Sequence, residues 1–263
     1  MTPAIVLLTD FGLEDNYVGL LKAVIASISS RTNVIDLTHQ IQPQNRVHGA
    51  VMLEISYPFF PKGSIFVCVV DPGVGSKRRI LCLKTSHYYF LAPDNGLLSL
   101  VGRRERFRTL RSVENKKFFR TRIPSSTFHG RDMMAPVGAH LARGGARVFR
   151  ALGPVISEMQ QVGVPTVKHR KGFLEGEILY FDHFGNAITN VKKNDASESF
   201  WEKSALEIRR YRLGHLRENY SGAKRKMTAL FNSFDQLEIA VPGGSAQRFA
   251  HLKAGEKVKI GNF

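Results

Sequence analysis

The chain has 263 residues, of which 43% are hydrophobic, and a formal net charge of +16. A chain of this length and hydrophobicity can bury a sizeable core, so the composition excludes an intrinsically disordered protein. No segment reads as a signal peptide or as a membrane span, and we therefore expect a cytoplasmic protein without a membrane partner.

The N-terminal half alternates between strand-like and helix-like segments. Apolar runs at 4–8, 34–37 and 65–70 predict strands, and the apolar spacing within 15–29 and 46–57 predicts helices between them. This alternation is typical of an α/β domain with a largely parallel central sheet.

Three apolar runs end in a polar turn that contains both Asp and Gly. Asp10 follows the first run, Asp71 follows the run at 65–70, and Asp94 follows a further run at 88–92. Ligands of open α/β sheets bind beyond the carboxyl ends of the strands. We therefore expect the three carboxylates to converge there.

The turn after Asp71 brings cations close to that carboxylate. Gly73 and Gly75 allow positive φ or a close approach, and either Arg78 or Arg79 could fold back toward Asp71. An ordinary turn with a surface ion pair is the alternative. A metal ion is another use of the carboxylates, but the arginines would compete with a cation, and we expect no metal.

Residues 125–136 predict a loop that runs into a helix continuing through His140 and Leu141. The loop contains His129 beside Gly130. A histidine exchanges a proton near neutral pH, and Gly130 leaves space for a substrate. The alternative is a histidine that only hydrogen-bonds a turn.

The sequence pattern changes near residue 155. The segment 153–170 contains Gly153, Pro154, Gly163, Pro165 and several polar side chains, which predicts a linker at 156–170 between an α/β catalytic domain at 1–155 and a substrate-binding domain at 171–263. Short alternating runs in the second domain favour a small β-barrel or β-sandwich. These runs lie at 174–181, 187–191, 227–231, 236–241 and 257–260. Elsewhere, Cys68 and Cys82 lie in apolar runs without metal-ligand spacing, and we expect buried free thiols.

The positive charge is clustered. Residues 103–122 carry nine basic and two acidic side chains with Phe107 among them, and a second basic cluster lies at 224–226. Clustered cations can bind the phosphates of nucleic acid. No zinc finger, helix-turn-helix or RNP-type motif accompanies them, so a solvated basic face is favoured over nucleic-acid binding as the main function.

Six motifs along the chain occur in the order and spacing of a known family. They read LLTDFG, VVDPGVGSKRR, APDNGLL, SSTFHGRD, FDHFGNAITN and NSFDQLEIAVPGGSA. Nearly the whole chain thus resembles the adenosine-forming S-adenosyl-L-methionine (SAM) hydrolases, or SAM hydroxide adenosyltransferases, which are related to the SAM-dependent fluorinase and chlorinase. The resemblance implies an N-terminal α/β domain, a C-terminal β-barrel-like domain, and attack of water on C5′ of SAM to release adenosine and L-methionine. SAM is then the substrate, and no cofactor is implied.

The resemblance also implies catalytic roles. The family's Asp, Arg and His fall on Asp71, Arg78 and His129. Arg78 would stabilise hydroxide character, while the other two orient the water and accept or relay its proton. Arg79 is the rival of Arg78, since the sequence does not say which one faces inward. Halogenating relatives lack this arrangement, so it favours hydrolysis over halide transfer.

Substrate-binding roles follow from the same resemblance. Asp10 would accept hydrogen bonds from the ribose hydroxyls. Asp182 would face the methionine ammonium, with Ser233 near the methionine carboxylate. The residues implied around the adenine are Phe184, Asn186 and Tyr220. Phe184 and Tyr220 could instead be core residues.

Two departures from the family pattern concern the second domain. Relatives usually have glycine where Asp235 stands, and the turn after Tyr220 is altered. Asp235 could strain its turn or tolerate the left-handed region.

The implied site residues fall into two sets, one in each domain. A substrate as large as SAM can contact both sets only across an interface. Relatives build that interface between the subunits of a trimer. We therefore expect a cyclic homotrimer in which each site combines the α/β domain of one chain with the β domain of the next.

Overall fold

The computed structural model describes residues 3–105, 108–223 and 225–263, which form two compact units, Met1–Gly163 and Val164–Phe263. Phe107 and Lys224, which belong to the two basic clusters, lie outside the described residues. No helix in the described ranges is long and apolar enough to cross a bilayer. Residues 157–167 contain neither helix nor strand.

The first unit is built on a seven-stranded sheet in the order β2-β1-β3-β5-β4-β6-β7. The strands are β1 (Ile5–Thr9), β2 (Val34–Thr38), β3 (Ile65–Val69), β4 (Ile80–Lys84), β5 (Tyr89–Pro93), β6 (Thr109–Ser112) and β7 (Val155–Ile156). The helices are α1 (Tyr17–Ile28), α2 (Arg46–Ser56), α3 (Ser99–Glu105) and α4 (Ala135–Ala151), with short turns η1 (Tyr57–Phe59), η2 (Lys116–Phe118) and η3 (Gly130–Met134).

The α/β class expected from the sequence is confirmed, and the sheet is mixed. Strands β2, β1, β3 and β5 run parallel, whereas β4, β6 and β7 pair antiparallel. The parallel order ends at β5 because only residues 85–88 connect β4 to β5, and so short a connection joins antiparallel neighbours.

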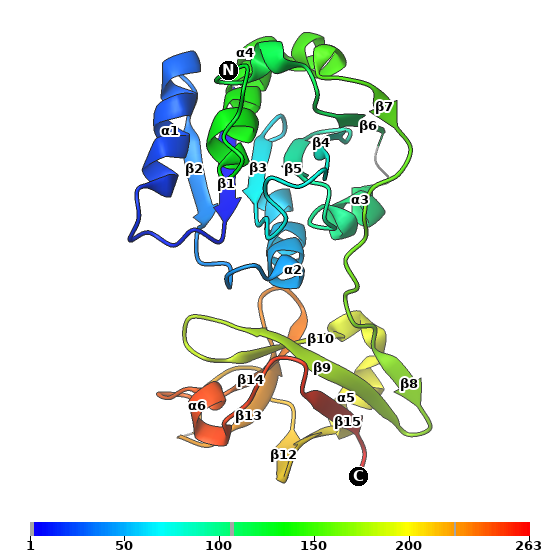
Figure 1. The fold of residues 1–263 in the computed structure, drawn as a ribbon. Coiled ribbons are helices and arrows are strands. Elements are labelled where there is room, and N and C mark those ends of the chain that lie inside the picture. The colour runs from blue at the N-terminus through cyan, green and yellow to red at the C-terminus, as the bar shows by residue number, and fades with distance from the viewer. Residues whose placement is uncertain (1–2, 106–107, 224) are drawn as a thin grey trace. The chain divides into compact units, whose positions relative to one another are not determined.

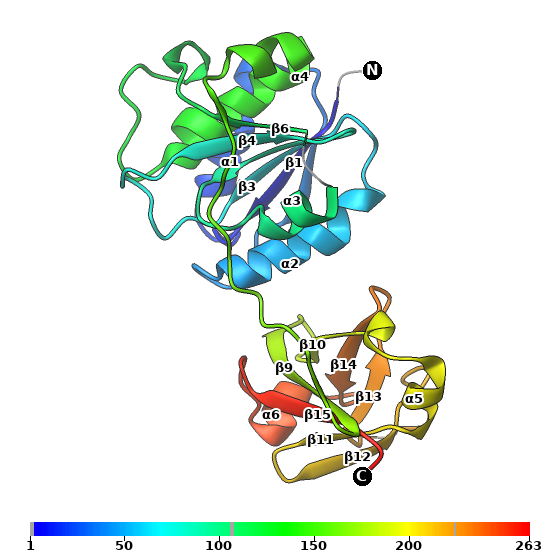
Figure 2. The same cartoon turned by 90° about the vertical axis from the view of Figure 1, so that its right-hand side faces the viewer.

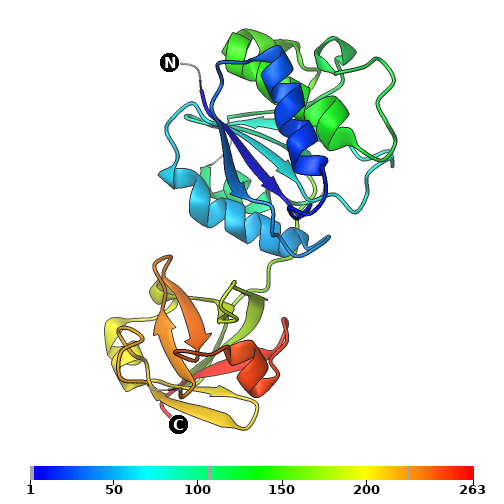
Figure 3. The same cartoon turned by 90° about the vertical axis from the view of Figure 1, so that its left-hand side faces the viewer.

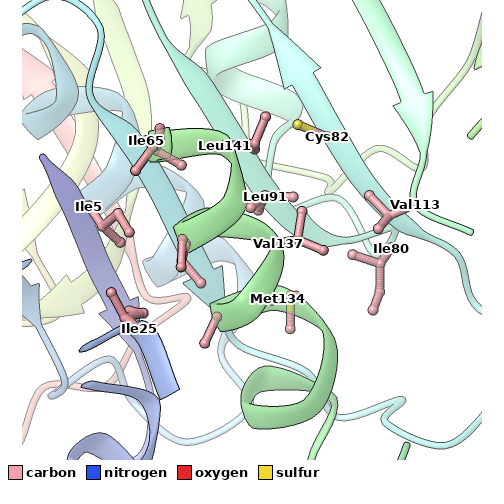
Figure 4. Packing of buried hydrophobic residues seen from close by; sticks show 14 of the residues in the cluster. Ile5, Ile25, Ile65, Ile80, Cys82, Leu91, Val113, Met134, Val137 and Leu141 are labelled. Carbon is pink, nitrogen blue, oxygen red and sulfur yellow. The ribbon is translucent and has the colours of Figure 1, made fainter. Parts of the chain in front are cut away.

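Helices cover both faces of this sheet, as Figure 1 and Figure 2 show, with α1 and α4 on one face and α2 and α3 on the other. Figure 3 shows α1 lying beside α4. Every residue of β1 and β3 is buried, as expected for strands with both faces covered. In the core, Ile65 and Leu91 of the sheet pack with Val137 and Leu141 of α4 (Figure 4).

Both cysteines are buried free thiols in this unit, as predicted. Cys68 lies in β3 and Cys82 in β4. Burial raises the pKa of each thiol.

The second unit is an antiparallel, nearly closed, barrel-like sheet in the order β12-β11-β15-β9-β10-β14-β13, with β8 paired to β9. Its strands are β8 (Lys168–Arg170), β9 (Phe173–Phe181), β10 (Ala187–Lys192), β11 (Ala205–Ile208), β12 (Tyr211–His215), β13 (Thr228–Phe231), β14 (Gln236–Ala240) and β15 (Lys257–Gly261). The helices are η4 (Lys193–Asp195), α5 (Glu198–Lys203) and α6 (Ala246–Ala250). A bridge between Arg217 and Leu230 joins the chain after β12 to β13, which brings the two ends of the sheet together.

Trp201 of α5 is buried in the core of this unit. Its indole Nε1–H donates to the carbonyls of Lys193 at 2.8 Å and Ala196 at 3.1 Å. The ring also packs edge-on against Phe231, with centroids 5.0 Å apart. The polar N–H of the indole is therefore hydrogen-bonded, and its apolar ring is packed against another aromatic side chain.

Candidate active site

A cavity of about 530 Å³ lies in the first unit, beyond the carboxyl ends of β1 and β3. Asp10 follows β1 and Asp71 follows β3, and both line the cavity. The loop that carries His129 forms another part of the wall. The sheet therefore places three of the predicted site residues in one cavity.

The side chains of Asp71, Arg78 and His129 form one hydrogen-bonded network. Arg78 Nε donates to Asp71 Oδ1 at 2.6 Å, and Arg78 Nη2 donates to Asp71 Oδ2. The same Nη2 lies 3.0 Å from His129 Nδ1. The side chains of Arg78 and Asp71 are only 8% and 5% exposed, so this bidentate pair is nearly buried and is not the surface ion pair of the alternative reading.

The network defines the protonation state of His129. A guanidinium can only donate, so Nδ1 of His129 must accept, and the neutral ring carries its proton on Nε2. Burial lowers the pKa of His129, and the positive charge of Arg78 lowers it further, against the opposing charges of Asp71 and Asp132. The imidazole is therefore held neutral beside the cation.

Gly75 allows the turn that follows Asp71 to pack closely against the loop that contains His129. Gly75 has φ +82°, and a Cβ atom at this position would lie 2.5 Å from the carbonyl oxygen of Ser126. Any other residue would push the two loops apart or strain the backbone. Gly75 thus allows Asp71 and His129 to come close enough for Arg78 to contact both.

Arg79 belongs to a different ion pair. Its Nε and Nη2 donate to Asp94 Oδ2 at 2.9 and 2.6 Å, and the backbone N–H of Gln160 donates to Asp94 Oδ1 at 2.7 Å. Asp94 does not line the cavity of Asp10 and Asp71. The predicted convergence of three carboxylates is therefore wrong for Asp94, because Arg79 holds it elsewhere. Within the described ranges, no group of three or more His, Cys, Asp or Glu side chains could hold a metal ion.

Asp10 is held by a strained neighbouring turn. Its Oδ2 accepts from the backbone N–H of Gln44 at 2.8 Å, and Gln44 has φ +64°, which a residue with a Cβ rarely adopts. Burial raises the pKa of Asp10, and the charge of Asp71 acts in the same direction. Such strain beside a cavity carboxylate is a common feature of ligand sites.

Sequence reasoning missed an aromatic wall of the same cavity. Phe11, Tyr17 and Phe128 line it and pack on one another with ring centroids 5.3 to 5.8 Å apart. Arg131 lies over the Phe128 ring at 5.0 Å. Phe128 and Arg131 flank His129 and Gly130 within the SSTFHGRD motif, which was the available signal.

Asp132 was also missed as an anchor of this wall. It is 1% exposed, and its carboxylate accepts from Arg131 at 2.7 and 2.8 Å and from the N–H of Ser125 at 2.9 Å. The hydrogen bonds from the Arg131 guanidinium lower the pKa of Asp132. The anchor lies in the π-helical turn η3, a conformation frequent at functional sites.

A second hollow of about 430 Å³ lies in the second unit and is lined by Phe184, Asn186, Tyr220 and residues 240–244. Phe184 is 71% exposed and Tyr220 is 46% exposed, so the alternative that they are core residues is wrong. Three predicted residues of the second domain therefore share one hollow.

Asp182 shapes the turn beside this hollow. Its Oδ1 accepts from the backbone N–H groups of Phe184 and Asn186 at 2.9 and 2.8 Å, and its Oδ2 accepts from Asn186 Nδ2 at 2.9 Å. A carboxylate with this arrangement closes an Asx-type turn. It thereby positions Phe184 and Asn186.

Glu238 was not foreseen from the sequence. It is 3% exposed in β14, and its Oε1 accepts from the hydroxyl of Tyr220 at 2.7 Å. Burial raises the pKa of Glu238, and Asp182 adds to this effect. Its position inside the fully buried strand QLEIA was the only available signal, because an acid there needs a partner.

The structure does not bring Ser233 into this hollow. Ser233 is exposed in the turn between β13 and β14 and is not among the lining residues. Asp235 of the same turn has φ +58°. It therefore adopts the left-handed region, which was one of the two possibilities raised by its replacement of a glycine that relatives usually have.

Family models match both parts of the chain. Residues 5–150 match the SAM hydroxide adenosyltransferase N-terminal domain, and residues 176–259 match the SAM hydroxide adenosyltransferase C-terminal domain. Together these ranges cover more than half of the chain.

Individual relatives agree with the family models. The chain is 32% identical over 268 residues to the (R)-S-adenosyl-L-methionine hydrolase of Methanocaldococcus jannaschii, covering 97% of this chain and 95% of the relative. It is 35% identical to the Thermus thermophilus protein of the same name, with 96% and 97% covered. A fluorinase of an Actinoplanes species is 27% identical over 75% of the chain and 74% of the fluorinase. Among solved structures, an uncharacterized conserved protein from Thermotoga maritima superposes with a TM-score of 0.90 at 32% identity, covering 98% of this chain and 99% of that one.

Proposed function

The chain belongs to the SAM hydroxide adenosyltransferase family, and from this premise we propose that it hydrolyses SAM to adenosine and L-methionine through Asp71, Arg78 and His129. The observation that carries the assignment of residues is the hydrogen-bonded network of these three side chains, because two of its members, Asp71 and His129, line the cavity that Asp10 also lines.

The reaction needs a well-placed water more than an acid. The water oxygen forms a bond to C5′ while the C5′–S bond breaks, and the bonding electron pair returns to sulfur. Methionine therefore leaves as a neutral thioether and needs no protonation. One proton of the water must be removed, so the protein has to align the nucleophile and accept that proton.

Each member of the network has a role that suits its environment. Arg78 stabilises hydroxide character as the proton leaves, because its charge is desolvated and fixed by two bonds to Asp71. Asp71 is the carboxylate that takes or relays the proton. His129, held neutral with its proton on Nε2, offers a donor that orients the water oxygen.

We assign the remaining residues to substrate recognition. Asp10 lines the cavity and accepts hydrogen bonds from the ribose hydroxyls. Its Oδ2 already accepts from the backbone N–H of Gln44, so we assign the ribose contact to the other carboxylate oxygen. Asn186, Phe184 and Tyr220 bind the adenine, which the shared hollow supports. The methionine half is assigned to Asp182 and Ser233 on the family resemblance.

We further propose that the protein works as a cyclic homotrimer in the cytoplasm without a metal. Two hollows in separate units, each holding part of the expected ligand set, support a site completed by a second chain. Two free and buried cysteines support a reducing compartment.

The test is chromatography of SAM incubated with the purified protein in chloride-free buffer. Equal amounts of adenosine and methionine are expected, with the same rate after treatment with a chelator, and Asp71→Asn should abolish both products. Absence of adenosine would overturn the proposed reaction. Loss of activity in chelator alone would overturn only the metal-free mechanism, and a halogenated nucleoside formed when halide is added would show halide transfer.

A further inference from the structure

Most of the positive charge lies in one stretch of sequence. Residues 103–163 carry thirteen Lys and Arg against four Asp and Glu, a surplus of nine, whereas residues 1–102 have a surplus of one. The first stretch includes β6, η2 and α4. The catalytic network does not explain this surplus, because Arg78 lies outside the stretch.

Two of these elements and β4 place cations around the C-terminal end of α4. Lys84 Nζ lies 5.8 Å and Arg111 Cζ 5.4 Å from the ring centroid of Phe149. Lys84 ends β4 and Arg111 lies in the antiparallel neighbour β6. Both cations therefore flank a single aromatic ring on the face of the sheet that α4 covers.

The segment before η2 brings further cations to the same end of α4. Asn115 Nδ2 donates to the carbonyl of Ala151 at 2.8 Å, and the backbone N–H of Asn115 donates to Leu152 at 2.9 Å. These bonds place the exposed Lys116 and Lys117 next to the helix end.

Arg147 and Arg150 of α4 are exposed and three residues apart, which puts them on one side of the helix. We give the name α4 basic patch to six cations around this helix end: the exposed Lys116, Lys117, Arg147 and Arg150 and the partly buried Lys84 and Arg111.

The charge of the patch is not neutralised within the described part of the chain. None of its six members forms an ion pair with a carboxylate there, and Glu114 is the single acid in the segment from 109 to 117. Arg111 Nη1 donates to the carbonyl of Gly153 at 2.5 Å, just beyond the last residue of α4, so one positive charge lies beside the negative end of the helix dipole. The patch therefore presents positive potential to the solvent.

We propose that the α4 basic patch binds nucleic acid through its phosphate backbone, independently of SAM hydrolysis. Phosphates bound by several Lys and Arg release counterions, which gives affinity without reading the bases. An anionic membrane surface fits less well, because interfacial binding also uses apolar side chains. The aromatic ring at the centre of the patch, Phe149, is only 3% exposed and lies beneath the cations.

The test measures anisotropy of a short labelled DNA duplex of random sequence, titrated with the full-length protein over a range of salt concentrations. The variant Lys116→Glu/Lys117→Glu/Arg150→Glu reverses the charge of three residues of the patch. The control Lys168→Glu/Arg170→Glu/Lys171→Glu changes the net charge equally at exposed positions of the second unit. SAM hydrolysis by both variants verifies that they fold.

The patch variant should lose at least about tenfold in duplex affinity, and the slope of log K against log salt should fall by about 0.9 for each phosphate contact removed. The control should lose much less. Equal losses in the two variants would overturn the proposal, because binding would then depend only on total charge. Absence of duplex binding by the wild type at physiological ionic strength, or binding to phosphatidylserine vesicles alone, would overturn it as well. If the reversed variant fails to fold, Lys116→Gln/Lys117→Gln should show the same trend more weakly.

Discussion

Arg78 and Arg79 are adjacent in sequence but bind different acids. Arg78 contacts Asp71 and His129 with a side chain that is 8% exposed. Arg79 contacts Asp94 with a side chain that is 41% exposed. The two arginines therefore form a matched pair for testing the catalytic assignment.

Arg78→Lys should lower kcat for SAM hydrolysis by roughly 10²–10³ while KM changes little, because a lysine cannot replace a bidentate donor fixed on two partners. Arg79→Lys should leave kcat within a few-fold of wild type. Both constants come from the rate of adenosine formation. Equal effects of the two substitutions, or a change confined to KM, would show that Arg78 does not act on the water.

The pH dependence of hydrolysis tests the neutral state of His129. Protonation of Nδ1 would remove the acceptor for Arg78 and place two cations 3.0 Å apart. Because burial and Arg78 lower the pKa of His129, the ring stays neutral as pH falls through the ordinary histidine value of 6.5. The acidic limb of kcat should therefore lie below pH 6.5.

The control for this profile is His140, whose pKa burial also lowers but which does not line the cavity. His140→Gln should leave the acidic limb in place, and His129→Gln should remove it from the residual activity. An acidic limb at or above pH 6.5 in the wild type would contradict the neutral assignment.

The sequence could indicate site residues where a regular element delivers them. Asp10 and Asp71 follow buried strands, so their convergence in one cavity was predictable from the strand ends. Arg78 and Arg79 lie in an irregular turn, where sequence alone does not determine side-chain direction. The error for Asp94 has the same origin, because its partner Arg79 comes from that turn.

At the scale of elements, the buried apolar strands were predictable from the sequence, whereas β6, which mixes apolar and polar residues, was not. β3 is uniformly apolar and β1 is apolar except for Thr9, and the predicted limits of both strands differ from the observed ones by one residue. β6 has the sequence TLRS and lies within a strongly basic stretch. Its alternation of polar and apolar residues is too short to be recognised among the surrounding charged residues. The π-helical turn η3 has no sequence pattern of its own, and its buried residue Asp132 accepts a hydrogen bond from the backbone of Ser125, which lies outside the turn.

The turn between β13 and β14 gives a prediction of stability. Asp235 has φ +58°, a conformation that costs a residue with a Cβ roughly 1 kcal/mol. Asp235→Gly removes this strain, although a more flexible unfolded chain offsets part of the gain. We expect the free energy of unfolding, measured with urea, to rise by up to about 1 kcal/mol.

Ser233→Gly provides the control in the same turn. Ser233 is exposed and its φ is not positive, so glycine brings only the entropic cost and should destabilise the protein. A loss of stability in both variants would indicate that the left-handed conformation of Asp235 carries no strain.

At the scale of the molecule, each of the two units has its own core and its own hollow. The family models divide the chain similarly, at 5–150 and 176–259. A change from helix-rich to strand-rich pattern marks this division in the sequence. No such pattern in the sequence indicates how many chains assemble. The prediction of a trimer rests on the size of SAM and on the resemblance to the family.

Complementation between inactive chains tests the proposed trimer. Asp71→Ala disables the first unit and Asn186→Ala the second, so neither homotrimer should contain a complete site. In a head-to-tail ring, every mixed trimer contains one junction of two intact halves, and random assembly of equal amounts should restore about a quarter of wild-type activity. Activity is measured after the two chains are refolded together. A fully active monomer by light scattering would contradict the shared site.

Trp201 is the single tryptophan of the chain, and both cysteines lie in the other unit. The buried indole in the second unit should emit at short wavelength and shift to the red only when that unit opens. The thiols of Cys68 and Cys82 should react with a chromogenic disulfide reagent only when the sheet of the first unit opens. One natural fluorophore and two natural labelling sites thus report separately on the unfolding of each half of the native chain, without any engineered probe.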